Sequence, residues 1–304
     1  MDHLGIPTKN TAAHVIYFRR TAQWIRHLPV LHNAEGLWSI LRNPYLKLLN
    51  AGHKGVPVRI AGRALVRLPS EYINTAWERY EPETMAAFVE WVRKHPFGHV
   101  LDIGSSIGIF SAAALFTGEG VSVVAFDSDL NSLAAVRRLC QYAPKERLQV
   151  VWGFLGSKES VAQPLDAAVS ETEQALKDRA PTGDVGTTQY ICFDSCNDGA
   201  IPCRKLDDLL QGAERDSRPL LIKCDVEGAE LLVLLGAERV LRGTNISILL
   251  SVHPPLLPAY GQSVQDVRAY LEHEGYTITI LGVDHEEHWW CEKPHQISKY
   301  ECTD

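Results

Sequence analysis

The stretch that decides the fold is His99-Val-Leu-Asp-Ile-Gly-Ser-Ser-Ile-Gly-Ile-Phe-Ser111. Its residues up to Ile103 are mostly apolar, which predicts a short strand buried on both faces. Gly104 and Gly108 follow and predict a tight turn that opens a helix over about residues 107–116. Glycines at such a turn let the backbone approach a ligand and let the helix pack closely on the strand. We therefore predict a cradle for a small molecule here, with a strand-to-helix turn that holds no ligand as the plainer alternative.

The residues of this turn indicate one class of cofactor. A nicotinamide dinucleotide would require Gly-x-Gly-x-x-Gly, and Ser106 stands where the second glycine belongs. An acid before the first glycine instead suits S-adenosylmethionine (SAM), because its sulfonium is cationic and SAM carries no phosphate. The predicted cofactor is therefore SAM. The cofactor contacts predicted in this stretch are Asp102, Gly104, Ser105, Ser106 and Gly108.

A second acidic strand end favours a ligand that contains a nucleoside. Residues 121–126 form an apolar, β-branched strand that ends at Asp127. A βαβ unit of this kind places an acid on the ribose hydroxyls about 20 residues or slightly more along the chain. We predict that Asp127 binds the ribose and that Ser128 contacts the cofactor beside it. The alternative is a helix cap, for which Asp129 is also placed, before a helix over residues 130–142.

Length, amino-acid composition and net charge limit the class of protein. With 304 residues, of which 45% are hydrophobic, the chain can form one elaborated α/β domain. The net charge of −7 argues against a partner that is a nucleic acid. No apolar run is long enough for a membrane span and no secretory signal opens the chain, so we expect a cytoplasmic protein without stable membrane insertion. Seven cysteines without a Cys-x-x-Cys pair favour reduced thiols, and no metal site is predicted.

The chain divides into two predicted parts. Residues 1–82 form an N-terminal helical and hairpin extension, and residues 83–304 form the main domain with an insert near 157–205. The helix predicted over residues 12–28 is amphipathic and basic. One interpretation is a helix that binds a membrane surface or a partner. We favour the other, a helix that packs on the main domain as a lid or as a homodimer contact. Residues 56–68 read as a hairpin.

Further strands complete a doubly wound, Rossmann-like α/β sheet. The strands after the first two are predicted at 148–152, 220–224, 246–252, 276–281 and 288–291. A short strand over residues 201–206 and a single helix from about residue 230 to about residue 241 are also predicted. Asp225 and His253 follow two of them directly. Because ligands of open α/β sheets bind beyond the carboxyl ends of the strands, we expect these residues to share one edge with Asp102 and Asp127. Phe154, after the third strand, and Glu81, in the loop before residue 83, are further predicted cofactor contacts.

One run in the second half of the chain resembles a known family. Lys223-Cys-Asp-Val-Glu-Gly-Ala-Glu230 is similar to the signature of the FkbM-type SAM-dependent methyltransferases, and the resemblance extends over roughly residues 56–291. The chain differs in carrying Gly104-Ser-Ser for the family's Gly-Ala-Asn, Asp127-Ser128 for Glu-Pro, and Ser251 where a Glu is usual. The resemblance implies a class I methyltransferase with a seven-stranded, mostly parallel sheet whose last strand is antiparallel. It also implies O-methylation of a sugar or another polyhydroxylated metabolite.

Catalysis would require a group that receives the hydroxyl proton. We predict Asp225 as the acid that orients the acceptor, His253 as the base, and Glu227 as a further catalytic group. The alternatives are that Asp225 caps the next helix, that His253 braces a turn, or that the two acids hold a metal. The expected partner is a small-molecule or glycan acceptor. The competing functions are an NAD-dependent oxidoreductase and a SAM-binding protein without catalysis.

Overall fold

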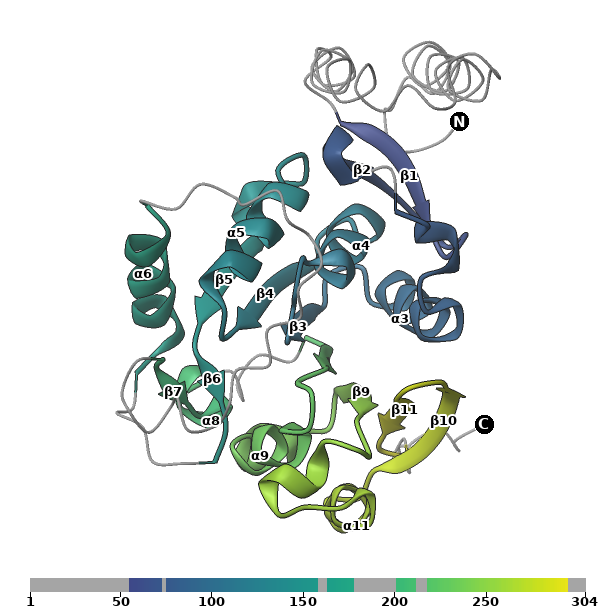
Figure 1. Cartoon of the computed structure of the whole chain (residues 1–304), viewed down its shortest axis with the longest axis vertical. Coiled ribbons are helices and arrows are strands. Elements are labelled where there is room, and N and C mark those ends of the chain that lie inside the picture. The colour runs from purple at the N-terminus through teal and green to yellow at the C-terminus, as the bar shows by residue number, and fades with distance from the viewer. Residues whose placement is uncertain (1–54, 73–74, 158–162, 178–200, 212–217, 295–304) are drawn as a thin grey trace, which may run out of the picture.

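The computed structural model describes residues 55–72, 75–157, 163–177, 201–211 and 218–294. The helix predicted over residues 12–28 and most of the insert at 157–205 lie outside the described residues. Figure 1 shows the described part as a central sheet with helices on both faces and with two separate two-stranded sheets, β1 (Val56–Ile60) with β2 (Ala64–Leu68) and β6 (Phe154–Leu155) with β7 (Cys203–Arg204). Within the described residues, we find no helix with the length and apolar character needed to cross a membrane.

The central sheet has seven strands in the order β10-β11-β9-β8-β3-β4-β5. Every neighbouring pair is parallel except those of β11, which runs antiparallel to both β9 and β10. The sheet predicted from the sequence is therefore confirmed, including its antiparallel last strand. The strands are β3 (His99–Ile103), β4 (Ser122–Asp127), β5 (Leu148–Trp152), β8 (Leu220–Cys224), β9 (Ile246–Val252), β10 (Thr277–Val283) and β11 (Glu287–Glu292).

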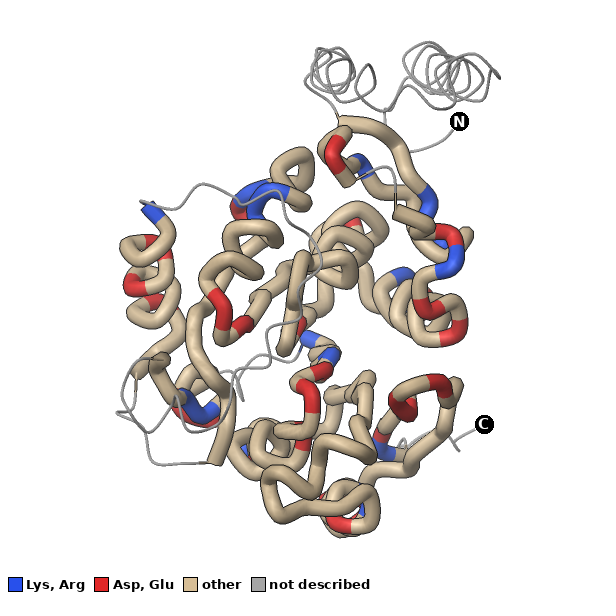
Figure 2. The backbone as a smooth tube through the Cα atoms, viewed as in Figure 1, with Lys and Arg blue, Asp and Glu red and all other residues tan. Residues whose placement is uncertain are grey.

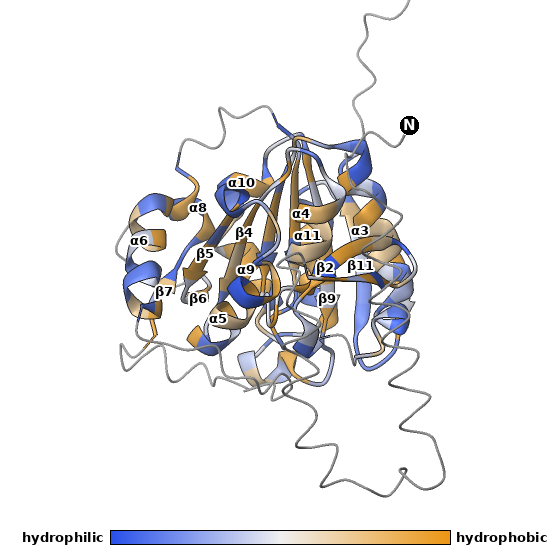
Figure 3. Cartoon of the chain, turned by 90° about the horizontal axis from the view of Figure 1, so that it is seen from above, coloured by the Kyte–Doolittle hydropathy of each residue, from blue (hydrophilic) through white to orange (hydrophobic). Residues whose placement is uncertain are grey.

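Each face of the sheet has its own hydrophobic core. Neighbouring residues of a strand point to opposite faces, and Val100 and Leu101 of β3 belong to different clusters of buried residues. Figure 3 shows β4 in the colours of apolar residues. One core receives α3 (Pro82–Lys94), α4 (Ile109–Thr117) and α5 (Leu130–Leu139). The other receives α8 (Leu206–Leu209), α9 (Glu230–Leu235), α10 (Glu238–Leu241) and α11 (Val264–His273). A further helix, α6 (Leu165–Leu176), packs beside the edge strand β5.

The predicted hairpin consists of β1 (Val56–Ile60) and β2 (Ala64–Leu68). Ala61 and Gly62 turn it with φ angles of 48° and 67°, the pair of positive values that a type I′ turn requires. The inward side chains of the hairpin are buried in the core that α3 and α4 share. The hairpin thus continues the main hydrophobic core.

Two local predictions differ from the structure. The single helix expected up to residue 241 is two helices, α9 and α10, that break at Gly236, where an added Cβ would lie 2.3 Å from the carbonyl oxygen of Gly156. The strand expected over residues 201–206 is only β7 (Cys203–Arg204), which pairs in parallel with β6 (Phe154–Leu155) before α8 begins. Both differences arise from tertiary contacts rather than from local propensity.

Candidate functional site

The turn after β3 is pressed against the end of β8. Gly104 has a φ of 70°, and a Cβ at this position would lie 1.7 Å from the carbonyl oxygen of Asp225. The amides of Gly104 and Ser105 both donate to the carbonyl of Phe126 at 3.0 Å, which fixes the turn to the end of β4. A glycine is required here because a side chain would collide with a neighbouring strand and not only with a ligand.

Asp127 holds the turn after β3 from the other side. Its Oδ2 accepts a hydrogen bond from the amide of Ser106 at 2.9 Å, and its Oδ1 accepts one from the amide of Asp129 at 2.9 Å. Asp129 is the N-cap of α5 and accepts from the amide of Asn131. The sequence left open which of the two acids caps the helix. The structure places Asp127 at the end of β4 and Asp129 at the helix cap.

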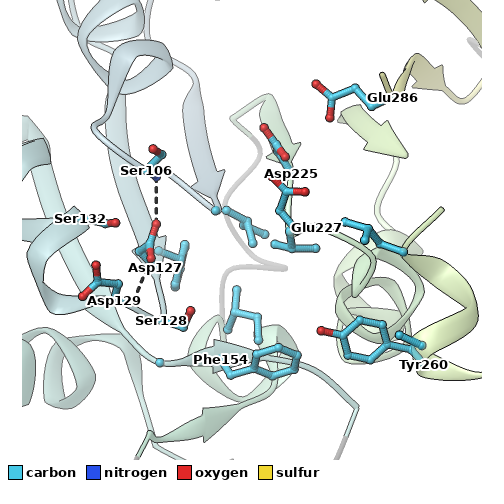
Figure 4. A pocket seen from close by; sticks show the side chains of 18 of the residues that line it. Ser106, Asp127, Ser128, Asp129, Ser132, Phe154, Asp225, Glu227, Tyr260 and Glu286 are labelled. Carbon is cyan, nitrogen blue, oxygen red and sulfur yellow. Dashed lines mark hydrogen bonds between the residues drawn. The ribbon is translucent and has the colours of Figure 1, made fainter. Parts of the chain in front are cut away.

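A cavity of about 630 Å³ opens at the carboxyl ends of these strands, a volume typical of small-molecule sites. Figure 4 shows Ser106, Asp127, Ser128 and Asp129 on one side of it, and Asp225, Glu227, Tyr260 and Glu286 on the other. We call these sides the cradle wall and the acidic wall. Of the predicted site residues, those that line the cavity are Glu81, Gly104, Ser106, Asp127, Ser128, Phe154, Asp225 and Glu227.

The structure places three predicted cofactor contacts behind the cavity. Asp102 is buried and its Oδ2 accepts from both the amide and the hydroxyl of Ser111, at 3.0 and 2.6 Å, so it anchors the first turn of α4. Gly108 packs against Val136, which an added Cβ would approach to 2.9 Å. Ser105 is buried and is not among the lining residues. These residues support the cradle wall, and the expectation of direct ligand contact is corrected accordingly.

Glu81 brings a carboxylate with one unpaired oxygen into the cavity from the segment before α3. It adopts a left-handed backbone conformation with a φ of 36°. Its Oε2 atom is buried and makes no hydrogen bond within the described residues. Burial raises the pKa of Glu81. A cationic ligand group near this oxygen would remove the cost of leaving it unpaired.

The acidic wall is organised around His253, which is only 4% exposed. Its Nδ1 lies 2.6 Å from Oε1 of Glu230, and its Nε2 lies 2.6 Å from Oε2 of Glu286. The same Nε2 is 3.3 Å from Glu227 and 3.6 Å from Asp225. Burial alone would lower the pKa of His253, but the bonds to Glu230 and Glu286 outweigh it and raise the pKa to about 10. The ring is therefore an imidazolium at neutral pH.

A second buried cation joins the two walls. The ammonium of Lys223 donates to Oδ2 of Asp225 at 3.2 Å and to the carbonyl of Gly104 at 3.3 Å, and it lies 3.8 Å from Oδ1 of Asp102. Burial would lower the pKa of Lys223, but Asp225 and Asp102 outweigh it and keep the group charged. The charge of Lys223 thus compensates the charges of Asp102, behind the cradle wall, and of Asp225, in the acidic wall.

Three functional residues were not found from the sequence. Lys223 and Glu230 stand at the two ends of the family-like run, so a signal existed, but no role was drawn from it. Glu286 lies in the turn between β10 and β11, far along the chain from the rest of the site. Its only sequence signal is an acid-rich and histidine-rich turn. Ligand atoms of Asp225, Glu227 and His253 lie within 4.8 Å of one another, as do those of Asp284, His285 and Glu286.

The sheet order, the antiparallel β11 and a cavity beyond the carboxyl ends of β3 and β4 together define a class I methyltransferase fold. The chain belongs to the FkbM methyltransferase family, because the family's methyltransferase FkbM domain matches residues 102–278, more than half of the chain. The resemblance noted from the sequence is thereby confirmed. No curated protein matches the chain.

Several solved structures are similar in fold. Methyltransferase FkbM from Methylobacillus flagellatus is 16% identical with a TM-score of 0.43, and the match covers 77% of this chain and 48% of that one. The chain thus spans about half the length of that relative. Precorrin-6y C5,15-methyltransferase from Geobacter metallireducens is 12% identical, with a TM-score of 0.38 and coverages of 72% and 93%. A TehB-like SAM-dependent methyltransferase from Corynebacterium glutamicum is 13% identical, with a TM-score of 0.38 and coverages of 73% and 93%.

Proposed function

We propose that this chain transfers a methyl group from SAM to a hydroxyl oxygen of a small polyhydroxylated acceptor, such as a sugar or a natural product. The observation that carries the proposal is the pairing of two unlike walls in one cavity. The cradle wall offers groups suited to a nucleoside, and the acidic wall offers carboxylates that accept hydrogen bonds from hydroxyl groups.

The residues on the cradle side fit SAM. Asp127 lies at the end of β4 and lines the cavity, where its carboxylate would accept hydrogen bonds from the ribose hydroxyls. The unpaired Oε2 of Glu81 would face a cationic part of the ligand. When bound, SAM supplies an electrophilic methyl group on a sulfonium.

The charge of the cavity favours a neutral acceptor. Among the described lining residues there are six acids, Glu81, Asp127, Asp129, Asp225, Glu227 and Glu286, and neither lysine nor arginine. Figure 2 shows the acids of the segments that follow β8 and β10. Such a surface repels phosphorylated acceptors and nucleic acids, whereas hydroxyl groups donate well to carboxylates.

The protonation states of His253 and Glu227 indicate which side chain acts as the base. Because His253 is an imidazolium, it has no lone pair with which to accept the hydroxyl proton, which argues against the base role expected of it. Glu227 lines the cavity, its side chain is 37% exposed, and burial raises the pKa of its carboxyl. A raised pKa brings a carboxylate closer to the range that general base catalysis requires. We assign Glu227 as the base and Asp225, held by Lys223, as the acid that orients the acceptor.

The function is tested with methyl-labelled SAM and a panel of sugars, glycosides and polyhydroxylated metabolites, with NAD as a competing ligand in calorimetry. We expect label on an acceptor oxygen and tighter binding of SAM than of NAD. Transfer to nitrogen or carbon, or tighter binding of NAD, would overturn the proposal.

The base assignment has its own test once an acceptor is found. The Glu227→Gln variant should lose about 10²-fold to 10⁴-fold in kcat, the usual contribution of a general base, with little change in SAM affinity. It should also lose the rise of the rate with pH that ionisation of Glu227 causes. Glu90→Gln, on the exposed side of α3, is the matched control. A pH profile that is unchanged in Glu227→Gln would assign the proton transfer to another group.

A further inference from the structure

The turn between β10 and β11 brings four metal-ligating side chains together. It contains Asp284, His285 and Glu286, and His288 follows as the second residue of β11. One ligand atom from each of the first three lies within 4.8 Å of the others. This cluster adjoins the acidic wall, because His285 and Glu286 also line the cavity.

His288 supplies an independent sign of a missing partner. It is 4% exposed, and its Nε2 is a buried atom that makes no hydrogen bond within the described residues. The ring is fixed from behind, since its Nδ1 lies 3.2 Å from the hydroxyl of Ser251. Its free Nε2 lies 3.6 Å from Oε1 of Glu286 and 3.7 Å from Oδ2 of Asp284.

These separations suit a shared ion better than direct hydrogen bonds. Nε2 of His285 also lies 3.6 Å from Oε1 of Glu286. A hydrogen bond between nitrogen and oxygen would be about 2.7–3.2 Å long. Two ligands of one tetrahedral metal, each about 2.0–2.2 Å from it, are about 3.3–3.6 Å apart. The three distances from a histidine Nε2 to a carboxylate oxygen match the second geometry. Nδ1 of His285 makes a direct contact of 2.9 Å with Oδ1 of Asp284, which leaves Oδ2 of Asp284 for the ion.

We propose that Asp284, His285, Glu286 and His288 bind a divalent transition-metal ion, with Zn²⁺ as the best match. The ligand atoms are Oδ2 of Asp284, Oε1 of Glu286 and the Nε2 atoms of the two histidines. Two imidazoles and two carboxylates favour zinc over calcium or magnesium, which prefer oxygen ligands alone. Ser251 orients His288, as outer-shell partners of metal-bound histidines do.

The neighbouring cluster around His253 is the less suitable site. Both ring nitrogens of His253 already have carboxylate partners at 2.6 Å, so neither presents a free lone pair. Glu286 uses Oε2 for His253 and leaves Oε1 toward His285 and His288. A metal in the turn would thus share Glu286 with the acidic wall without displacing His253.

The test is calorimetric titration of the chelator-treated full chain with Zn²⁺ alone, in the absence of SAM and acceptor. We expect one ion per chain, bound about 10²-fold or more weakly by His285→Ala and His288→Ala, since even loss of an outer-shell partner costs 10–100-fold. His273→Ala, an exposed histidine on α11, is the matched control and should bind normally. Zn²⁺ should also raise the Tm of the wild-type chain and of the control by more than that of His285→Ala.

His285→Ala is decisive if His288→Ala fails to fold, because the His285 side chain is 79% exposed and packs little. Two results would overturn the proposal: no Zn²⁺ binding, or binding that survives His285→Ala and is instead lost in Glu227→Gln. The second result would move the ion to the His253 cluster. Since no SAM or acceptor is present, neither outcome depends on the proposed methyl transfer.

Discussion

The two walls of the cavity are built by different means. The cradle wall is held by backbone amides, which donate to Asp127 and to the carbonyl of Phe126. The acidic wall is held by side-chain charges, with several carboxylates arranged around His253. The cradle wall is therefore fixed by local chain geometry, whereas the acidic wall depends on a balance of charge between distant segments. Variants at Lys223, Gly104, Asp127 and Asp129 separate the two kinds of support.

The largest loss of stability is expected from substitution of Lys223, the cation that lies between the two walls. Lys223→Met would leave the buried Asp102 and the partly buried Asp225 without a compensating cation, which should lower the free energy of unfolding by about 3–5 kcal/mol. Burial already raises the pKa of Asp102, and loss of Lys223 would raise it further. A raised pKa favours the folded state at low pH, so the deficit should shrink from pH 8 to pH 5 in urea unfolding. Lys94→Met, in an exposed ion pair, is the control. A deficit equal at both pH values would show that Lys223 acts by packing alone.

The next largest loss of stability is expected at Gly104, where the turn after β3 contacts the backbone of Asp225. Gly104→Ala combines a φ of 70° with a Cβ 1.7 Å from the carbonyl oxygen of Asp225, and should cost about 3 kcal/mol or more in stability. Gly275→Ala is a matched control, since its φ is 85° but nothing lies within 4 Å of the added Cβ. It should cost only the strain of the left-handed conformation, about 1–2 kcal/mol. If Gly104→Ala and Gly275→Ala lost similar stability in thermal unfolding, the turn after β3 and the end of β8 would separate easily enough to accommodate the added Cβ.

Ligand binding tests the cradle wall alone. Desolvation in the cavity raises the pKa of Asp127 to about 7. SAM binds best to the ionised carboxylate, so wild-type affinity should fall about tenfold from pH 8 to pH 6 as Asp127 takes up a proton. Asp127→Asn should bind SAM about 1–3 kcal/mol more weakly at pH 8 and lose this dependence, since titration of SAM itself is common to both proteins. Calorimetry at three pH values checks this, and parallel profiles would remove Asp127 from the ribose role.

The smallest effect concerns the helix cap. Asp129→Ala removes the acceptor of the Asn131 amide and should cost about 1 kcal/mol in urea unfolding, whereas Asp129→Asn should keep most of the cap. Because Asp127 remains, the pH dependence of SAM binding should persist in both variants. Loss of that dependence in Asp129→Ala would show that the two acids act as one unit.

Much of the cradle wall was predictable because its determinants are close together in the chain. An apolar run, two glycines and an acid at the next strand end define the strand, the turn and the position of Asp127. The direction of Asp102 was not predictable. Whether an acid at a strand end faces the cavity or the following helix depends on the packing of α4, whose Ser111 donates two hydrogen bonds to Asp102.

The acidic wall was predictable only in part. Asp225 and His253 follow adjacent strands, so their meeting follows from the topology of a parallel sheet. The protonation of His253 did not follow, because it depends on Glu230 and on Glu286, which reaches the ring from the turn before the antiparallel strand β11. No local pattern states which acid in that turn approaches the imidazole.

By itself, the sequence determined the parallel sheet, the glycine turn and the presence of acids at the strand ends, because periodicity and turn chemistry act over a few residues. The tertiary structure alone decided which acids line the cavity, which cation compensates them and which histidine nitrogen stays unpaired. Those properties depend on distances between segments far apart in the chain, and a change of about 1 Å at such distances decides between an ion pair, a hydrogen bond and a shared metal ion.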